Sequence, residues 1–436
     1  MNVLVDSGGY ALNNVGDIAM LQVAVSRLQA LWPEASIGVL SASPDRLARY
    51  CPGAKAVASN GLRKWLEWSR LPGRSRAPKA FSRHLAATES GLRDHLPGLS
   101  DGLAMRRARE HPADRADLES FLSVARSADL LVLGGGGYMT DVFRGHALSS
   151  LELLSRFQRR RVPTAMVGQG IGPLSDRTLV SRSRVALPRT GMIGLREGRA
   201  GLPLLASLGV ARSRIQITGD DAIEPAFASR PERLGTCLGI NVRVSSYSSV
   251  GLDLLARLRS ALGQVSDEVG ATLRALPVAR AAADSDVQTL RELLGDTGQG
   301  DDLDGLDAPL ALIRRVGECR VVVTGSYHAG VFALSQGIPV VGLTRSTYYT
   351  DKFLGLADQF GTGCNVVGLD QPDLVEALSA SVRELWRAAD GLRPLLLAAA
   401  ASQIQAGHDA YARLSLLAGQ PGVALPQQPS RTENFG

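Results

Sequence analysis

The chain has 436 residues, of which 45% are apolar and 21% are charged. This composition excludes a fibrous or disordered protein, and the length predicts two or three domains. No stretch approaches the roughly 18–20 consecutive apolar residues of a membrane span. The start, MNVLVDSGGY, lacks the basic and apolar regions of a signal peptide. We therefore expect a cytosolic protein.

The net charge of +6 and the pI near 9.3 suit an anionic ligand, a membrane surface or nucleic acid. The last two need a localised basic patch, and such a patch lies between Arg63 and Arg109. This stretch is either a solvated insertion or a mobile lid that contacts an anionic lipid-linked substrate at the inner face of the membrane. We expect no binding to nucleic acid. The four cysteines are too scattered to indicate a zinc site or a disulfide framework.

The amino-terminal half repeats a strand, turn and helix pattern. Its first ten residues form an apolar strand that runs into Gly8 and Gly9, and a helical pattern follows from Asp17 to Leu31. Further buried-type strands, each ending in small or polar residues, are predicted at residues 35–43, 128–137, 162–173, 191–197 and 213–221. Apolar strands that alternate with helices indicate a parallel sheet covered on both faces.

The pattern changes after Asp221, where residues 223–236 carry two prolines and no clear period, so we place a linker there. The second half repeats the first, with strands predicted at residues 237–244, 271–279, 320–326 and 338–344, a short helix at residues 326–337, and a helical end from about Gln371 to Gly419. We therefore predict an α/β fold of two Rossmann-like, doubly wound domains that face a cleft. The predicted domains are residues 1–225, with a basic insertion at residues 61–115, and residues 236–420, followed by a flexible tail at residues 421–436.

In open parallel sheets ligands bind at the carboxyl ends of the strands. After the first strand, Asn14 and Asp17 are either ligand-binding residues or only turn and cap residues, with Asp17 at the helix N-cap. The run Gly134–Gly137 leaves backbone N–H groups free to bind an anion, as in phosphate-binding turns at helix N-termini, or else allows tight packing. No nucleotide-binding signature accompanies it.

Three further strand ends carry candidate residues. Gly168–Pro173 forms an extended lip that either faces a ligand or is structural. Arg196 can grip a carboxylate or phosphate with two hydrogen bonds, and its alternative is a surface salt bridge. Asp220 and Asp221 are adjacent on an extended chain and therefore face opposite ways, so we do not expect both to reach one substrate.

The sequence TGSYHAG at residues 324–330 is the most specific of these strand ends. His328 falls near the start of the short predicted helix, where the helix dipole favours the neutral ring as a general base or hydrogen-bond partner. A lone histidine is more often structural, but this one follows a strand and has no apolar stripe to join. We therefore predict a functional role for His328.

Together these segments resemble the polysaccharide pyruvyl transferase family. The matching motifs occur in the family's order and cover nearly the whole chain to about Phe360. They are Asn-x-Gly-Asp at Asn14, Gly16 and Asp17; Gly-Gly with a later aspartate at Gly135, Gly136 and Asp141; Gly-Gln-x-Ile-Gly-Pro at Gly168–Pro173; Arg-Asp/Glu at Arg196 and Glu197; His-Ala-x-x-Phe-Ala-Leu at His328–Leu334; and tyrosine before lysine at Tyr348 or Tyr349 and Lys352. Each motif is weak alone, and the combination is fairly specific.

The resemblance implies a GT-B-like fold and a transferase of exopolysaccharide or other cell-surface glycan biosynthesis. Pyruvate would pass from phosphoenolpyruvate to two hydroxyls of a saccharide or lipid-linked saccharide as a cyclic ketal, without a metal or a further cofactor. This chemistry needs a proton donor for the enol methylene, cations for the carboxylate and phosphate, and a base for the hydroxyls.

The resemblance also assigns roles to residues of this sequence. His328 and Asp17 are expected in catalysis, and Arg196, Tyr327 and Lys352 in donor binding. The residues expected to bind the acceptor are Asn14, Gly135, Gly136, Asp141 and Gln169.

One position departs from the family, which commonly has Arg-x-His where this sequence has Ser326-Tyr327-His328. We expect Ser326 to remain part of the donor site and Arg243 or Arg345, after neighbouring strands, to supply the missing charge. If neither does, the donor need not be phosphoenolpyruvate. The alternatives are a nucleotide-sugar glycosyltransferase on the same scaffold and a non-catalytic glycan-binding protein that keeps the cleft.

Overall fold

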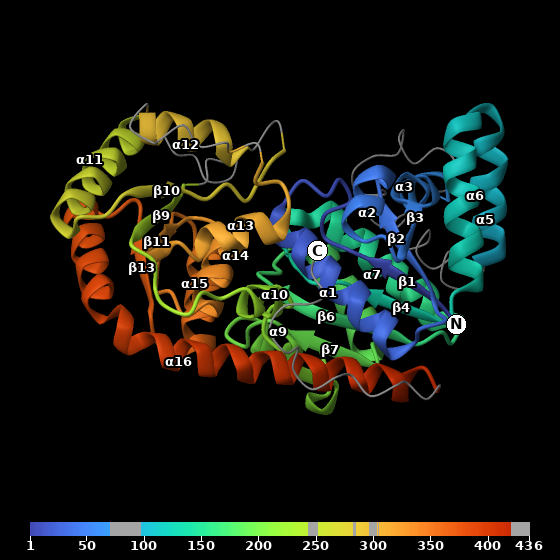
Figure 1. The fold of residues 1–436 in the computed structure, drawn as a ribbon. Coiled ribbons are helices and arrows are strands. Elements are labelled where there is room, and N and C mark those ends of the chain that lie inside the picture. Colours follow the sequence, from blue (N-terminus) through green and yellow to red (C-terminus); the bar gives the residue numbers. More distant parts are fainter. Residues whose placement is uncertain (70–96, 243–251, 282–284, 296–302, 304, 420–436) are drawn as a thin grey trace.

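The computed structural model describes residues 1–69, 97–242, 252–281, 285–295, 303 and 305–419, which form two parallel sheets packed with helices (Figure 1). The first sheet has the order β3 (Ala54–Ala58), β2 (Ser36–Ser41), β1 (Asn2–Asp6), β4 (Leu130–Leu133), β6 (Thr164–Ile171), β7 (Met192–Leu195) and β8 (Ile215–Ile217), and β5 (Gly136–Met139) pairs with β6. The second has the order β10 (Leu273–Ala275), β9 (Cys237–Asn241), β11 (Cys319–Thr324), β12 (Val340–Thr344) and β13 (Cys364–Gly368). The predicted α/β class with two doubly wound parallel sheets is confirmed.

Helices alternate with the strands. Around the first sheet, here called the first domain, they are α1 (Val15–Leu31), α2 (Pro44–Tyr50), α3 (Ser59–Trp68), α5 (Pro97–Arg107), α6 (Pro112–Ser127), α7 (Arg144–Arg159), α8 (Arg177–Ala186) and α9 (Gly201–Ser207). The second domain has α11 (Leu252–Val269), α12 (Asp286–Leu294), α13 (Pro309–Val316), α14 (Tyr327–Ser335), α15 (Thr347–Phe360) and α16 (Leu374–Leu417). Short 3-10 turns lie at Ala108–Glu110, Asp141–Phe143, Leu187–Arg189 and Arg212–Arg214. The predicted linker contains a helix, α10 (Ile223–Ala228), which the sequence did not predict because the segment carries two prolines.

The first sheet is buried on both faces because alternate residues of its central strands enter different cores. Leu4 of β1 and Leu131 of β4 join one apolar cluster, while Val3 and Val132 join another. This is the arrangement expected for strands that are apolar on both sides. Each sheet reverses its strand order beside its first strand, between β1 and β4 and between β9 and β11. Such switch points are where open α/β sheets bind ligands.

The start of α1 differs from the prediction in its capping residue. Asn14 is the N-cap, and its side chain accepts hydrogen bonds from the backbone N–H groups of Gly16 at 3.0 Å and Asp17 at 3.2 Å. Asp17 therefore lies inside the first turn, where a carboxylate is stabilised by the helix dipole without capping the helix.

The glycine run also differs from the prediction. It does not open a helix as a phosphate-binding turn would, because Gly136–Met139 forms β5 and pairs with β6. Residues Gly168–Gly170 are likewise inside β6 and not in a lip beyond it. Gly135 fits tightly here, since a methyl group in its place would lie 2.8 Å from Sδ of Met20. Close packing therefore accounts for Gly135.

Helix α16 spans both domains (Figure 1). Leu378 and Val382 near its start are part of the core of the second domain. Tyr411 and Leu414 near its end are part of a core of the first domain. The end of the predicted second domain thus returns to the first sheet.

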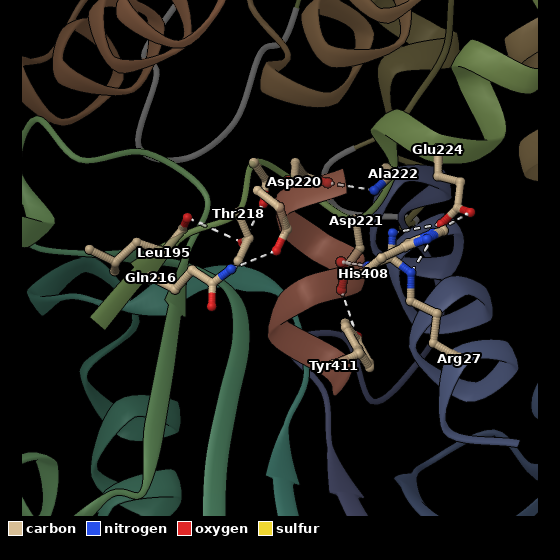
Figure 2. Close-up of polar contacts among 12 residues, drawn as sticks. Arg27, Leu195, Gln216, Thr218, Asp220, Asp221, Ala222, Glu224, His408 and Tyr411 are labelled. Atoms are coloured by element: carbon tan, nitrogen blue, oxygen red, sulfur yellow. Dashed lines mark hydrogen bonds and ion pairs between the residues drawn. The ribbon is translucent and has the colours of Figure 1, made fainter. Parts of the chain in front are cut away.

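A buried ionic cluster holds the end of α16 in place (Figure 2). Arg27 of α1 donates hydrogen bonds to Asp221 at 2.9 Å and to Glu224 at 2.6 Å. From α16, Tyr411 donates to the other oxygen of Asp221 at 2.8 Å, and Nε2 of His408 lies 3.0 Å from Glu224. The cluster links α1, the segment after β8 and α16.

The basic stretch is described only in part, because residues 70–96 lie outside the described residues, as does the predicted tail. Trp65, near its start, is buried and donates a hydrogen bond to Asp101 of α5 at 3.0 Å. Helices α5 and α6 stand at the end of the first domain that is far from the second sheet (Figure 1). A contact between this stretch and a membrane stays a prediction. Among the described helices, none is long and apolar enough to cross a membrane.

Candidate active site

A cavity of about 360 Å³ lies between the two domains. Its size falls in the lower part of the range of about 300–1,000 Å³ that is usual for small-molecule sites. The first domain lines it with Gly8–Asn14, Asp17, Gly136–Tyr138, Phe143, His146 and Arg196, and the second with Ala279, Ala281, Ser326–His328, Tyr349 and Lys352. The segments after β1, β4 and β11 thus meet here, so the cavity joins the switch points of both sheets.

Arg196 follows β7, and its side chain is 1% exposed. Its guanidinium carbon lies 4.0 Å from the centre of the Tyr327 ring, and its Nη1 lies 3.4 Å from Oδ2 of Asp220. Nε of Arg196 is buried without a hydrogen-bond partner among the described residues. Burial by itself would lower the pKa of Arg196, but Tyr327 and Asp220 outweigh it and raise the pKa. The result is a permanently charged group with an unused donor.

Lys352 of α15 meets Arg196 at Gly137, from the other domain. A methyl group at Gly137 would lie 2.8 Å from Nη2 of Arg196 and 2.8 Å from Nζ of Lys352. The two nitrogens are therefore no more than twice that distance apart. The Tyr348 hydroxyl donates a hydrogen bond to the Gly137 carbonyl at 2.9 Å, and Nζ of Lys352 lies 4.0 Å from the Tyr348 ring. Two cations at this separation can bind one anion together.

His328 is the second residue of α14, as predicted, and its ring packs against the start of α1. A methyl group at Gly16 would lie 2.0 Å from Cγ of His328, so only glycine admits the ring. Nε2 of His328 lies 3.7 Å from Oδ2 of Asp220. Burial raises the pKa of Asp220 to about 6, against the opposing effect of Arg196. The pair can therefore hold and pass a proton near neutral pH.

Glu197 adds a second perturbed carboxyl beside the cations. Its side chain packs against Gly355 of α15, and its Oε2 is buried without a hydrogen-bond partner among the described residues. Burial raises the pKa of Glu197 to about 7, although Arg196 and Lys352 oppose this. No group of three or more His, Cys, Asp or Glu side chains in the described ranges is arranged to hold a metal ion.

A family model of polysaccharide pyruvyl transferases matches residues 14–347. The chain belongs to the polysaccharide pyruvyl transferase family. It is therefore a transferase. The matched residues include every segment that lines the cavity except Gly8–Asn13 and Tyr349 and Lys352. No curated protein matches the sequence.

The fold of this pyruvyl transferase family member can also be compared with solved structures. A Listeria monocytogenes protein assigned as a UDP-N-acetylglucosamine 2-epimerase has 11% identity and a TM-score of 0.55, covering 95% of this chain and 96% of its own. S. aureus MnaA, solved with UDP, has 12% identity and a TM-score of 0.53, with 100% of both chains covered. Arabidopsis thaliana UGT89C1, solved with quercetin, has 11% identity and a TM-score of 0.52, covering 96% and 99%. These similarities support the GT-B architecture.

Most residues that the family resemblance assigned to the donor or to catalysis do meet in the cavity. They are Asp17, Arg196, Ser326, Tyr327, His328 and Lys352, and Asn14 and Gly136 from the acceptor set join them. Asp220 and Asp221 face opposite ways, as predicted, with Asp220 toward Arg196 and Asp221 toward Arg27.

Four predicted residues of this family member lie elsewhere. Asp141 accepts hydrogen bonds from the backbone N–H and hydroxyl of Ser175, both at 2.6 Å, and so holds the loop before α8. Gln169 is buried under β5 and donates to the Gly134 carbonyl and, at 3.0 Å, to the Tyr138 hydroxyl. Gly135 packs on Met20, as described above. Arg345 is exposed and its Nε pairs with Asp370 at 3.0 Å. Arg243 lies outside the described residues.

The sequence prediction missed Tyr10, Phe143 and His146 as lining residues, and of the two tyrosines in the family motif it is Tyr349 that lines the cavity. Tyr10 directly follows the glycine pair after β1, and this position at the end of a strand could have identified it as a lining residue. Phe143 and His146 lie in a 3-10 turn and the first turn of α7, and their approach to the cavity depends on the path of β5.

Proposed function

We propose that this transferase moves pyruvate from phosphoenolpyruvate to two hydroxyls of a sugar and releases inorganic phosphate. The observation that carries the proposal is the meeting of Arg196 and Lys352 at Gly137, with 2.8 Å from each charged nitrogen to the same point. Phosphoenolpyruvate carries a carboxylate and a phosphate close together, and a pair of cations on opposite sides of a cleft suits that charge distribution. Lys352 thus supplies a charge that Ser326 does not.

The reaction balances with the groups at hand. A proton is added to the methylene carbon of phosphoenolpyruvate, which makes it a methyl group, and one sugar hydroxyl forms a bond to the adjacent carbon. The bond from that carbon to the phosphate oxygen then breaks, phosphate leaves with the electron pair, and the second hydroxyl closes the ketal. Of the two protons that the hydroxyls lose, one replaces the proton given to the methyl group and the other leaves with phosphate.

His328 and Asp220 are the proton carriers in this proposal. His328 lines the cavity, and its Nε2 lies 3.7 Å from a carboxylate whose pKa is raised to about 6 by burial. A histidine beside such a carboxylate can give a proton to the enol carbon and recover one from a hydroxyl. Asp17, in the first turn of α1 and also in the lining, is a second base on the acceptor side.

The test is phosphate release by purified protein with phosphoenolpyruvate and a panel of sugar acceptors, with the ketal methyl group detected by NMR. Lys352→Met should raise the KM for phosphoenolpyruvate by about tenfold to a hundredfold, because a charge-assisted contact contributes about 1.5–3 kcal/mol. Arg345→Met removes an equal charge outside the cavity and should leave KM unchanged. His328→Gln should lower kcat by about 10²–10⁴.

Two results would count against the proposal. One is the absence of phosphate release with every acceptor. The other is thermal stabilisation by UDP or GDP but not by phosphoenolpyruvate, which would favour a nucleotide-sugar donor instead. If Lys352→Met and Arg345→Met changed the KM for phosphoenolpyruvate equally, the meeting of Arg196 and Lys352 at Gly137 would no longer support the proposed donor site.

A further inference from the structure

The cavity has a part that the proposed donor site leaves unused. Three partly exposed rings line it: Tyr10 after β1, Phe143 in the turn before α7, and His146 in the first turn of α7. We call these three residues the aromatic wall. Among the described lining residues, the lysine and arginine side chains are those of Lys352 and Arg196, which meet at Gly137. The aromatic wall itself therefore carries no fixed positive charge.

Two rings of the aromatic wall, those of Tyr10 and His146, pack against neighbouring side chains. His146 stacks on Tyr10 with ring centres 4.8 Å apart and an angle of 25° between the planes, and the buried ring of Tyr138 lies 4.5 Å behind it. The Tyr10 hydroxyl donates to Asp6 at 2.8 Å, and Ser150 donates to the other oxygen of Asp6 at 2.7 Å. These contacts place Tyr10 and His146 at the cavity before a ligand binds, which lowers the entropic cost of binding.

Hydrogen bonding leaves one polar group of this region unused. The hydroxyl of Tyr10 is bonded to Asp6, and that of Tyr138 is bonded to the Gly134 carbonyl at 3.0 Å. Nε2 of His146 is buried without a hydrogen-bond partner among the described residues, which is an unfavourable state. Because the ring also borders the cavity, a modest turn about its Cβ–Cγ bond would offer a nitrogen to a ligand hydroxyl. Burial lowers the pKa of His146, so at neutral pH the ring is uncharged and can both donate and accept.

Phe143 gives the aromatic wall an exposed apolar face. It is 36% exposed and lines the cavity. A pyranose ring has one face of C–H groups and a rim of hydroxyls. Such a ring matches an apolar ring beside an unpaired imidazole, as small-molecule sites combine aromatic surface with a few polar groups.

Resting on the proposed function, we propose that the aromatic wall is the acceptor subsite and that it selects an uncharged pyranose. The C–H face of the sugar packs on Phe143, and a hydroxyl bonds to His146. A uronic acid would bring a carboxylate to a surface whose described residues include no cation to compensate its lost hydration, while Arg196 and Lys352 are occupied by the donor. The same wall that accepts a neutral sugar therefore excludes its acidic counterpart.

Binding without turnover tests this subsite directly. The dissociation constants of methyl hexopyranosides and the matching methyl hexuronosides are measured by ligand-observed NMR titration with saturating inorganic phosphate, which occupies Arg196 and Lys352 without turnover. The neutral glycosides should bind at least tenfold more tightly than the acidic ones. Phe143→Ala should weaken the neutral glycosides by about fivefold to tenfold, the usual value of an aromatic contact, and His146→Phe, which keeps a ring, by about fivefold. Val142→Ala, at an exposed neighbour outside the cavity lining, is the matched control and should change nothing.

The outcomes separate this inference from the proposed function. Equal binding of neutral and acidic glycosides, no glycoside binding, or unchanged binding in both Phe143→Ala and His146→Phe would overturn the acceptor subsite even if phosphate release is observed. The expected binding pattern without phosphate release from phosphoenolpyruvate would support the subsite and remove the donor. Melting temperatures of the two variants near that of the wild type exclude misfolding as the cause of weak binding.

Discussion

Gly16→Ala tests whether His328 acts from the position it has against α1. A methyl group at Gly16 would lie 2.0 Å from Cγ, 2.2 Å from Nδ1 and 2.4 Å from Cβ of His328. Non-bonded carbon atoms prefer separations of about 3.5–4.0 Å. The ring or the start of α1 must therefore move by about 1.5 Å, a distance comparable to a covalent bond.

Neither side can move easily. Gly16 and His328 are both buried, and the residue before Gly16 is tied to the second domain, because the Val15 N–H donates to the Val278 carbonyl at 3.0 Å. A misplacement of about 1 Å in an active site can lower the rate by about 10², and an overpacked core costs about 1–3 kcal/mol. We therefore expect Gly16→Ala to lower kcat about a hundredfold and to lower Tm by a few degrees.

The assay is the rate of phosphate release together with a melting curve. Gly391→Ala in α16 is the control, because a methyl group there meets nothing within 4 Å and alanine favours a helix by up to about 1 kcal/mol. The double variant Gly16→Ala/His328→Gly removes all three clashing atoms, so Tm should recover while the rate stays low. A wild-type kcat in Gly16→Ala would refute the position of the catalytic ring.

Two further predictions concern buried charges. Burial raises the pKa of Glu197 from 4.5 to about 7, so between these two pH values the folded protein holds a proton that the unfolded chain releases. The folded state therefore loses stability as the pH rises through this window. The Tm of Glu197→Gln, compared with that of the wild type at the same pH, should therefore increase from about pH 4.5 to pH 7. Arg27→Met leaves Asp221 and Glu224 buried without the arginine that pairs with them, which lowers the free energy of unfolding by about 3–5 kcal/mol. Tyr411→Phe removes only one hydrogen bond, which lowers it by about 1–3 kcal/mol. In differential scanning fluorimetry Arg27→Met should lower Tm more than Tyr411→Phe, and the reverse order would contradict the cluster.

The parts of the site that the sequence predicted well are those that depend on local pattern. Arg196 directly follows a strand, and His328 lies in the first turn of a helix. The apolar run beside each residue is what allowed its position to be predicted. Asp220 and Asp221 face opposite ways as predicted, although they lie beyond the end of β8 and Asp221 is in a turn before α10. Parallel sheets then bring such strand ends together at one edge, which is why local pattern was sufficient here.

The parts that were missed depend on tertiary contacts. Four glycines have no side-chain period, so nothing in the sequence distinguishes the strand β5 from a turn. That strand is held by Gln169, whose side chain bonds to the Gly134 carbonyl and to Tyr138 across it. The same path of the chain brings His146 to the cavity from a helix. A strand-end argument cannot find residues of that kind.

The described residues contain no replacement for the family's arginine, because Lys352 is itself one of the residues that match the family. Ser326 stands where the family commonly has arginine, and the sequence argument sought the charge on neighbouring strand ends. Arg345 lies there but is exposed and paired with Asp370. Among the described lining residues the arginine and lysine are Arg196 and Lys352, both expected from the family resemblance, and Gly137 leaves room for the two side chains. The absence of a side chain at Gly137 thus lets Lys352 reach the cavity beside Arg196.

If Arg196 and Lys352 bind the donor as proposed, donor binding depends on the relative position of the two domains. Arg196 belongs to the first domain and is 1% exposed, and Lys352 belongs to the second. An anion can reach the guanidinium only if the walls separate, and once bound it draws both charges together. Small-angle X-ray scattering should therefore show a smaller radius of gyration as phosphoenolpyruvate is added, and Lys352→Met should remove most of that change. A radius that does not change with the donor would show that the donor enters without domain movement and would contradict this reasoning.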